Sequence, residues 1–188
     1  MTDLESAADQ LIDAIKASLD SIRSNPSYAD PLSRVAAHGF LVNVLISRLE
    51  GDISFDADYP YFRHIDPRTR EGGDNPDQQY AIAKINGNES YRIWGRLGSA
   101  TRLDVQVYAG DPYIPGRGGR SASFINFEDI EFDADGGFEI NLSPAPAGAD
   151  RPMNHLENPP DSTRVLVRQI FATWTDDDTC LLYTSPSP

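Results

Sequence analysis

The sequence predicts an α+β protein in which an N-terminal helical hairpin precedes an antiparallel β-sandwich of jelly-roll type. Apolar residues recur at intervals of three and four through the first fifty positions, which is the period of an amphipathic helix. After residue 80 the apolar runs become short and lie between turn-forming residues, which is typical of β-strands. No helical pattern separates these runs, so we expect the strands to be antiparallel.

Residues 1–51 predict the helical hairpin. The apolar stripe of the first helix consists of Leu4, Ala8, Leu11, Ile15, Leu19 and Ile22. Asn25-Pro26 ends this helix, and Asp30-Pro31 begins the second, because Asp favours the N-cap and Pro the first turn. The second helix has a broad apolar face and ends at Gly51. We expect the two helices to pack against each other in antiparallel orientation.

Residues 52–79 predict an irregular connector that is rich in Asp, Tyr, Pro and Phe. A connector of this length usually lies against the body of a domain or carries function. At its end, Asn75-Pro76-Asp77 predicts an Asx-type turn, in which a side-chain oxygen accepts a hydrogen bond from a backbone N–H. Tyr80 is expected to pack against this turn, so Asn75, Asp77 and Tyr80 are predicted to be structural residues.

Residues 80–175 predict the β-domain. Strands are expected at residues 80–85, 90–95, 102–108, 123–127, 138–142 and 164–174. Asn86-Gly87 lies between the first two strands and is a strong signal for a type I′ hairpin, which needs positive φ at both central positions. The first two strands are therefore predicted to pair with each other.

Residues 176–188 predict a tail outside this domain. The terminal run CLLYTSPSP is similar to a translated adapter sequence at the end of an assembled metagenomic fragment. We expect the tail to be artefactual or an ordinary disordered terminus, and the β-domain before it to be incomplete.

Composition excludes several classes of partner. The 188 residues carry a formal net charge of -13 with a pI near 4.5, which argues against nucleic acid and anionic membranes as partners. The acidic N-terminus lacks a secretory signal, and no apolar run is long enough for a spanning helix, so a cytoplasmic location is expected. Cys180 is the single cysteine, and His38, His64 and His155 show no metal-ligand spacing. No metal and no other cofactor is expected.

A mixed polar and aromatic strand face is the candidate ligand-binding site. Its predicted residues are Arg92, Trp94, Gln106, Tyr108 and Arg168. Strand alternation places the first four opposite an apolar face, and arginine beside flat aromatic rings suits a small anionic or amphipathic molecule. Residues 84–120 also carry six basic against three acidic residues, a local charge of +3 in an acidic chain.

The alternative is a structural sheet face that the connector or the helices cover, with its arginines paired to nearby acids. For Arg168, which lies in an apolar strand and would be costly to bury unpaired, the candidate partners are Asp74, Asp77 and Asp104.

Several segments together resemble bacterial proteins that carry the domain of unknown function 1214. They are DPRTREGG, DNPDQQYAIAKINGNESYRIWGRLG, INLSPAP and TRVLVRQIFATW, with Asn75-Pro76-Asp77, Tyr80, Ser90-Tyr91-Arg92-Ile93 and Val167-Arg168-Gln169 as the most specific pieces. The similarity covers residues 30–175 approximately. It implies a β-rich, jelly-roll-like domain, often with a helical region or companion domain, and it supplies no catalytic residues. Members usually continue beyond the Arg-Gln strand, which is a second reason to expect an incomplete chain.

Two functions from different classes fit these observations. The first is a non-enzymatic binding or accessory module that receives a small anionic or amphipathic ligand on the candidate face. The alternative is an enzyme of metabolite or xenobiotic processing, with Asp77 or Asp104 near Arg92 or Arg168 as a proton-transfer pair. A structural interpretation, in which the helices form a dimer or partner surface, is a third. The sequence favours the first and identifies neither the ligand nor any catalytic residue.

Overall fold

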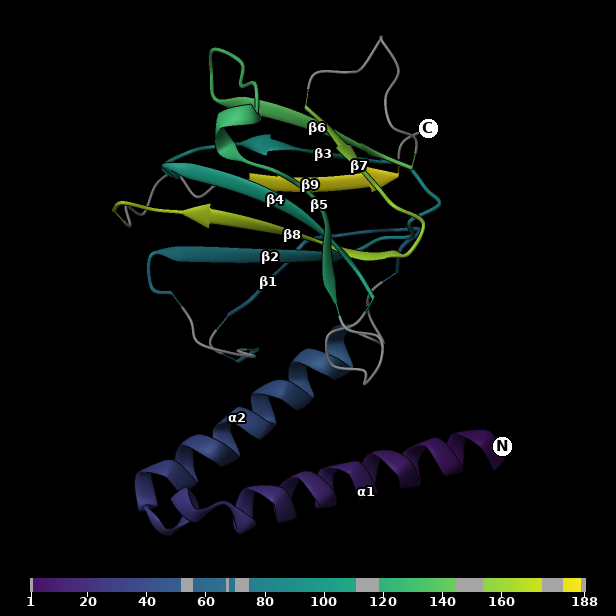
Figure 1. The fold of residues 1–188 in the computed structure, drawn as a ribbon, viewed down its shortest axis with the longest axis vertical. Coiled ribbons are helices and arrows are strands. Elements are labelled where there is room, and N and C mark those ends of the chain that lie inside the picture. The colour runs from purple at the N-terminus through teal and green to yellow at the C-terminus, as the bar shows by residue number, and fades with distance from the viewer. Residues whose placement is uncertain are drawn as a thin grey trace. The chain divides into compact units, whose positions relative to one another are not determined.

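The computed structural model describes residues 2–51, 56–66, 68–69, 75–110, 119–144, 154–173 and 181–186. The chain divides into two compact units, a helical unit of Met1–Leu49 with Pro67–Gly72 and a β-unit of Glu50–Asp66 with Gly73–Pro188. Two helices at the N-terminus and two mostly antiparallel sheets make this an α+β fold, as the sequence predicts (Figure 1).

The helical unit consists of α1 (Thr2–Ser24), the 3-10 turn η1 (Pro26–Ala29) and α2 (Pro31–Leu49). Asn25 caps η1 by accepting a hydrogen bond from the Ser27 backbone N–H at 2.9 Å. Asp30 caps α2 in the same way, by accepting a hydrogen bond from the Ser33 N–H at 2.7 Å. Hydrogen bonds from the backbone and side chain of Ser33 lower the pKa of Asp30. The break at Asn25-Pro26 and the restart at Asp30-Pro31 are thus confirmed.

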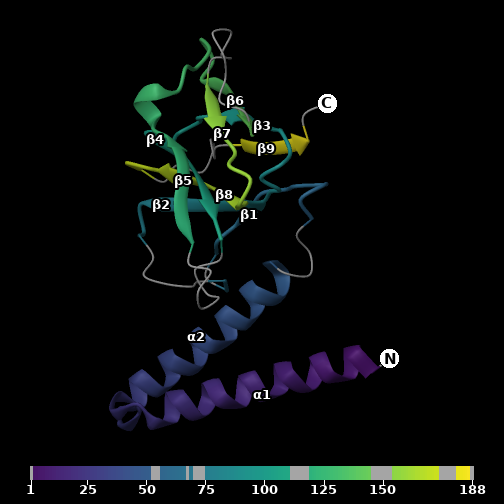
Figure 2. The same cartoon turned by 45° about the vertical axis from the view of Figure 1, so that its right-hand side comes forward.

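The two helices do not pack along their length as the hairpin prediction expected. They diverge from the joint at η1 (Figures 1 and 2), and the half-buried apolar residues of α1 lie near that joint. Tyr28 and His38 meet there with ring centroids 5.8 Å apart. Away from the joint, most apolar side chains of both helices are exposed, so the helical unit has little core of its own.

The β-unit contains two sheets. The five-stranded sheet has the order β1 (Arg63–His64), β2 (Gln78–Lys84), β8 (Ser162–Ile170), β4 (Arg102–Ala109) and β5 (Arg120–Ile125). The four-stranded sheet has the order β7 (His155–Glu157), β6 (Gly137–Ser143), β3 (Tyr91–Arg96) and β9 (Leu181–Pro186). Every pair of neighbouring strands is antiparallel except β6 with β7.

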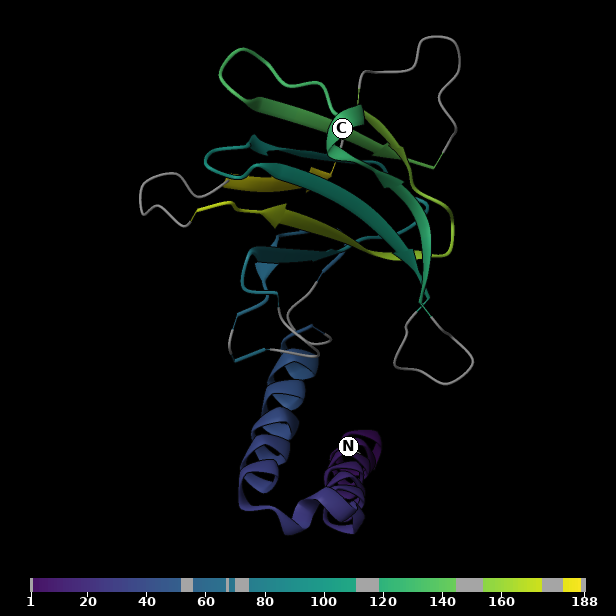
Figure 3. The same ribbon diagram turned by 60° about the vertical axis from the view of Figure 1, so that its left-hand side comes forward.

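One apolar core lies between the inward faces of the two sheets. Alternate residues of each strand are buried, for example Val105 and Val107 on β4 and Ile93 on β3, as the period of a strand requires. In Figures 1 and 3, β6 and β3 of one sheet lie above β8 and β2 of the other. Each sheet therefore also has an outer face, where the side chains that alternate with the buried ones lie.

The predicted hairpin between β2 and β3 is wrong. β2 pairs with β1 and β8, whereas β3 pairs with β6 and β9, so the Asn86-Gly87 turn carries the chain from one sheet to the other. Gly87 does not have positive φ; it is needed because its backbone lies against another chain segment. A Cβ at this position would meet the Pro159 carbonyl oxygen and lie 2.5 Å from the Pro160 carbonyl carbon. The turn serves close backbone approach rather than a type I′ conformation.

The expected disorder of residues 176–188 is also corrected for part of the tail. Residues Leu181–Pro186 form β9, which pairs with all six residues of β3. β3 offers an open edge for this strand on the side away from β6. Residues 176–180 and Trp174 lie outside the described residues.

Candidate functional site

The five predicted ligand-binding residues lie on two separate surfaces. Arg92 and Trp94 alternate with buried Tyr91 and Ile93 and therefore lie on the outer face of the four-stranded sheet. The other three are on the outer face of the five-stranded sheet: Gln106 and Tyr108 on β4, and Arg168 on β8. The two faces point away from each other across the core, so the prediction of one shared face is corrected.

Arg92 has local partners that explain it as a surface residue. Its guanidinium lies 4.9 Å from the Trp94 ring centroid and 3.6 Å from a carboxylate oxygen of Glu139 on the neighbouring strand β6. Both members of the ion pair are about half exposed, so the pair contributes little to stability. This face of the four-stranded sheet offers no uncompensated charge at Arg92.

The outer face of the five-stranded sheet brings together a different set, which we name the Arg–Tyr face. It consists of Tyr80 and Ile82 on β2, Arg164, Leu166 and Arg168 on β8, and Asp104, Gln106 and Tyr108 on β4. These residues form three cross-strand rows, of Tyr80, Arg168 and Asp104, of Ile82, Leu166 and Gln106, and of Arg164 with Tyr108. All of them are half-buried.

Two arginines of this face each lie over a tyrosine ring. The Arg168 guanidinium is 5.6 Å from the Tyr80 centroid, and the Arg164 guanidinium is 5.2 Å from the Tyr108 centroid. Among the described residues no carboxylate lies within ion-pair distance of either guanidinium. The Nε atom of Arg168 is buried and makes no hydrogen bond. Because an unpaired buried donor is costly, Arg168 is suited to a partner that the described part of the chain does not supply.

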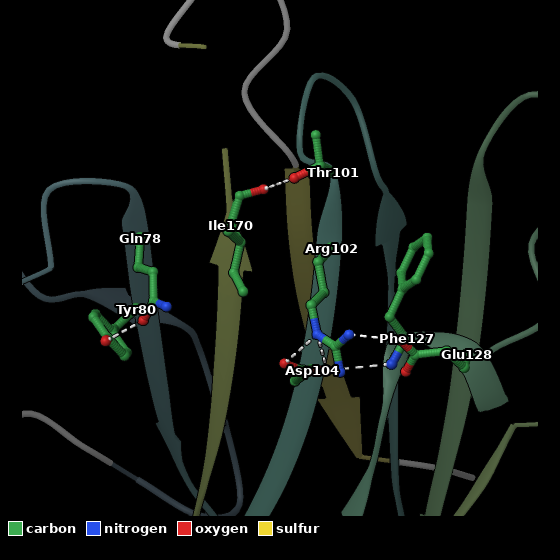
Figure 4. Close-up of polar contacts among 8 residues, drawn as sticks. All are labelled: Gln78, Tyr80, Thr101, Arg102, Asp104, Phe127, Glu128 and Ile170. Atoms are coloured by element: carbon green, nitrogen blue, oxygen red, sulfur yellow. Dashed lines mark hydrogen bonds and ion pairs between the residues drawn. The ribbon is translucent and has the colours of Figure 1, made fainter. Parts of the chain in front are cut away.

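The predicted partners of Arg168 are engaged elsewhere or lie outside the described residues. Asp104 is directly opposite Arg168, but both of its carboxylate oxygens bind the Arg102 Nε, at 3.0 and 3.1 Å (Figure 4). One of them also accepts the Phe127 backbone N–H at 3.2 Å. Asp77 makes no ion pair with Arg168, and Asp74 is not among the described residues.

Arg102 is held by a second acid as well as by Asp104. Its Nη1 lies 2.6 Å from Glu128, and hydrogen bonds to Asp104 and Glu128 raise the pKa of Arg102 (Figure 4). A hydrogen bond from its own backbone N–H, and then the bond from Arg102, lower the pKa of Glu128. Asp104 is consequently a positioning acid for Arg102 and is not free to act as a base toward a ligand beside Arg168.

The predicted turn residues form one local arrangement at the start of β2. The Asn75 side-chain oxygen accepts the Asp77 N–H at 2.9 Å, which is the geometry of an Asx turn. The Asp77 carbonyl accepts the Phe171 N–H at 2.9 Å and so fixes this turn to the end of β8. Tyr80 directs its hydroxyl to Gln78 (Figure 4). The Arg168 guanidinium lies over the Tyr80 ring. Tyr80 therefore belongs to the Arg–Tyr face as well as following the turn.

Sequence reasoning missed Arg164, although its signal was present. In TRVLVRQI the residues Arg164, Leu166 and Arg168 alternate with buried Val165 and Val167, so all three share one strand face. Residues four apart on a strand are separated by about 13 Å. The two arginines thus lie at the ends of a short apolar strip made by Leu166 and Ile82, with Gln106 beside it.

A groove of about 890 Å³ lies between the edge strands β5 and β7 and is the second feature that the sequence did not indicate. It is lined by residues 121–125, Asp129 and residues 154–157. His155 is buried there, with its Nε2 atom 2.8 Å from the Ser143 hydroxyl. Asn154 has φ of 57° and is held by hydrogen bonds in both directions with the Glu131 backbone. The groove is a poor site for an anion, because Asp129 and Glu157 among its lining residues carry carboxylates.

Two kinds of site are absent from the part of the chain that the structure describes. No three His, Cys, Asp or Glu side chains lie close enough together there to bind a metal ion. No described helix has the length and apolar character that a membrane crossing requires.

Comparison with known proteins gives structural relatives without an assigned activity. The chain is similar to an uncharacterized protein from Burkholderia cenocepacia whose crystal structure is known, with 28% identity and a TM-score of 0.84. That similarity covers 95% of this chain and 49% of the other, so this chain spans about half the length of that relative. The VPA0106 protein from Vibrio parahaemolyticus matches with 13% identity and a TM-score of 0.43, over 98% of this chain and 43% of that protein. No protein-family model and no curated protein matches the chain.

Proposed function

We propose that this chain is a small-molecule-binding β-sandwich protein of jelly-roll type, and that its Arg–Tyr face binds an anionic amphipathic ligand. One observation carries the proposal: Arg164 and Arg168 lie over tyrosine rings at the two ends of an apolar strip and have no acidic partner among the described residues. The same proposal includes two predictions from the sequence. They are membership in the domain-of-unknown-function 1214 family and a cytoplasmic location.

The chemistry of a stacked guanidinium supports an anionic ligand. Contact with the tyrosine ring uses the flat face of the group and leaves its N–H edge for a planar acceptor such as a carboxylate or sulfate. A forked pair of N–H donors gives direction as well as charge, which a lysine would not. The overall charge of -13 repels anions at a distance, so specific binding here must come from these short-range contacts.

The strip between the two arginines supports an apolar part in the same ligand. Leu166 lies directly between them on β8, and Ile82 and Gln106 flank it on the neighbouring strands. An alkyl chain along this strip would bury apolar surface at about 25 cal/mol per Å² while its head group binds one guanidinium. A ligand with an acid at each end could bind both arginines.

Isothermal titration calorimetry with octanoate, decanedioate, acetate and octanol tests the proposal. We expect octanoate and decanedioate to bind. Acetate, which lacks the alkyl chain, and octanol, which lacks the acid group, should bind at least about tenfold more weakly. Arg168→Gln and Arg164→Gln should weaken binding by a similar factor. Arg92→Gln, a matched change on the outer face of the other sheet, should leave it unchanged. Equal binding by Arg168→Gln and the unaltered protein, or no binding by any of the four compounds, would contradict the proposal.

A further inference from the structure

The helix α2 carries a continuous apolar seam that no described part of the chain covers. The α2 seam consists of Leu32, Val35, Gly39, Val42, Ile46 and Leu49. Their spacing alternates between three and four residues, which is the a and d pattern of helices that pack side by side. The five apolar side chains are between 42% and 78% exposed, and Gly39 is exposed too. A single exposed leucine is normal on a protein surface, but the exposure of six seam residues along one side of a helix needs an explanation.

The seam is distinct from the side of α2 that faces its own chain. Half-buried Ser33, Ala37, Leu41 and Val44 lie on the opposite side of the helix, offset from the seam by about half a turn, whereas half-buried Asn43 and buried Ser47 lie on one flank of the seam. A closer approach of α1 onto that opposite side would therefore leave the seam uncovered.

Gly39 points to a second helix at close range. Glycine in the middle of a helix lowers helix stability relative to alanine, so it needs a compensating role. A Cβ at Gly39 would meet no atom within 4 Å, so no neighbour in this chain requires a glycine there. A glycine at the centre of a packing seam lets a partner helix bring its backbone near, and this gives Gly39 a role.

The charges of the two helices favour a second copy of this chain as the occupant. α1 carries five acidic and two basic residues, a net charge of -3, whereas α2 carries two arginines and no acid, a net charge of +2. In a two-fold assembly each copy brings an acidic α1 toward the basic α2 of the other, so opposite charges meet twice. The positions that flank the seam, Ala36, His38, Asn43 and Leu45, carry no Asp, Glu, Lys or Arg that would repel a like helix.

We propose that the α2 seam packs antiparallel against the α2 seam of a second copy, with the two-fold axis near Gly39. In this register Leu32 of one copy faces Ile46 of the other, Val35 faces Val42, and the two Gly39 residues meet at the crossing. The seam is thus complementary to itself, as a two-fold interface must be. The helices of the two copies together form a four-helix assembly in which the exposed apolar residues of the α2 seam become core.

Light scattering after size exclusion and sedimentation velocity of the full chain test this proposal. From about 1 to about 100 µM, where ordinary helix-mediated dimers dissociate, we expect a reversible monomer–dimer equilibrium. Val42→Glu should raise the dissociation constant at least about tenfold, because it places two acids against apolar seam residues. Phe40→Glu is the matched control, since Phe40 is similarly exposed on the same helix but lies off the seam, and it should remain dimeric.

Gly39→Ala separates packing from helix formation. Alanine favours the helix, so this variant should keep its helical circular dichroism while its dimer becomes weaker. A chain that is monomeric throughout the range, or a dimer that Val42→Glu does not weaken, overturns the proposal. At a concentration where the unaltered chain is also monomeric, a lower melting temperature of Val42→Glu would place the seam against its own β-unit and would overturn the proposal equally.

Discussion

Arg168 of β8 and Asp104 of β4 occupy directly opposite positions in the five-stranded sheet, yet they form no ion pair. The carboxylate of Asp104 turns instead to Arg102, two residues away on its own strand, and binds its Nε through both oxygens. This contact holds the Asp104 carboxylate away from Arg168, and the ligand site proposed at Arg168 depends on it.

Release of Asp104 should therefore close the proposed site. In Arg102→Gln the Asp104 carboxylate loses the Nε–H that both of its oxygens share and can pair with Arg168, so we expect affinity for octanoate to fall about tenfold. Calorimetry would measure the change. The double variant Arg102→Gln, Asp104→Asn should restore binding, because no acid then competes with the ligand. Unchanged affinity in the single variant would show that Asp104 does not control Arg168.

Gly87 should tolerate no side chain. In Gly87→Ala the new Cβ would overlap backbone atoms of Pro159 and Pro160, which cannot rotate away as a side chain can, so we expect a loss of about 1 to 3 kcal/mol in unfolding free energy. Urea unfolding would measure this loss. Gly51→Ala is the control, because its Cβ would meet nothing within 4 Å, and it should change stability by less than about 0.5 kcal/mol. Equal stability of the two variants would contradict the close approach.

The turn at Gly87 also shows what the sequence could and could not predict. Strand alternation identifies which residues of one strand share a face, and the predicted positions of β2, β3, β4 and β6 agree with the structure within one or two residues. Alternation does not identify the sheet to which a strand belongs. Arg92 and Gln106 look equivalent by their period, but the chain changes sheet between them, so they lie on opposite sides of the core. Pairing is a tertiary property, and β2 finds its partner β8 about eighty residues further along.

Gln169 should be replaceable by an apolar residue without loss. Its side chain is 1% exposed, and neither amide atom has a hydrogen-bond partner, while Gln79 opposite has an unpartnered oxygen as well. An unpaired buried amide costs about 1 to 3 kcal/mol, so Gln169→Met, which keeps the volume, should raise the unfolding free energy by about 1 kcal/mol. Thermal and urea unfolding would measure it.

Asn158→Ala provides the contrast to the Gln169 variant. The Asn158 amide nitrogen donates to the carbonyls of Asn86 and Glu89 at 2.9 Å each, so its removal takes one hydrogen bond from each carbonyl and should cost about 1 to 3 kcal/mol. Should Gln169→Met prove as destabilising as Asn158→Ala, the buried glutamine must have a partner such as an ordered water.

Tyr91 should make the stability of the β-unit decline above pH 10. Its ring lies in the core, its hydroxyl accepts the Asn86 N–H at 2.8 Å, and burial raises the pKa of Tyr91 above its usual value near 10. As pH rises through 10, the unfolded chain ionises this tyrosine before the folded chain does, so the folded state loses stability from there toward the raised pKa. Tyr91→Phe loses two hydrogen bonds, the one from the Asn86 N–H and the one that the hydroxyl donates to the Ala57 carbonyl at 3.1 Å, and should cost about 1 to 3 kcal/mol at neutral pH. The same variant removes this contribution to the alkaline slope. Urea unfolding of both proteins between pH 8 and pH 11 would compare the slopes, with the other tyrosines common to both. Parallel curves above pH 10 would show that Tyr91 titrates alike in the folded and unfolded states.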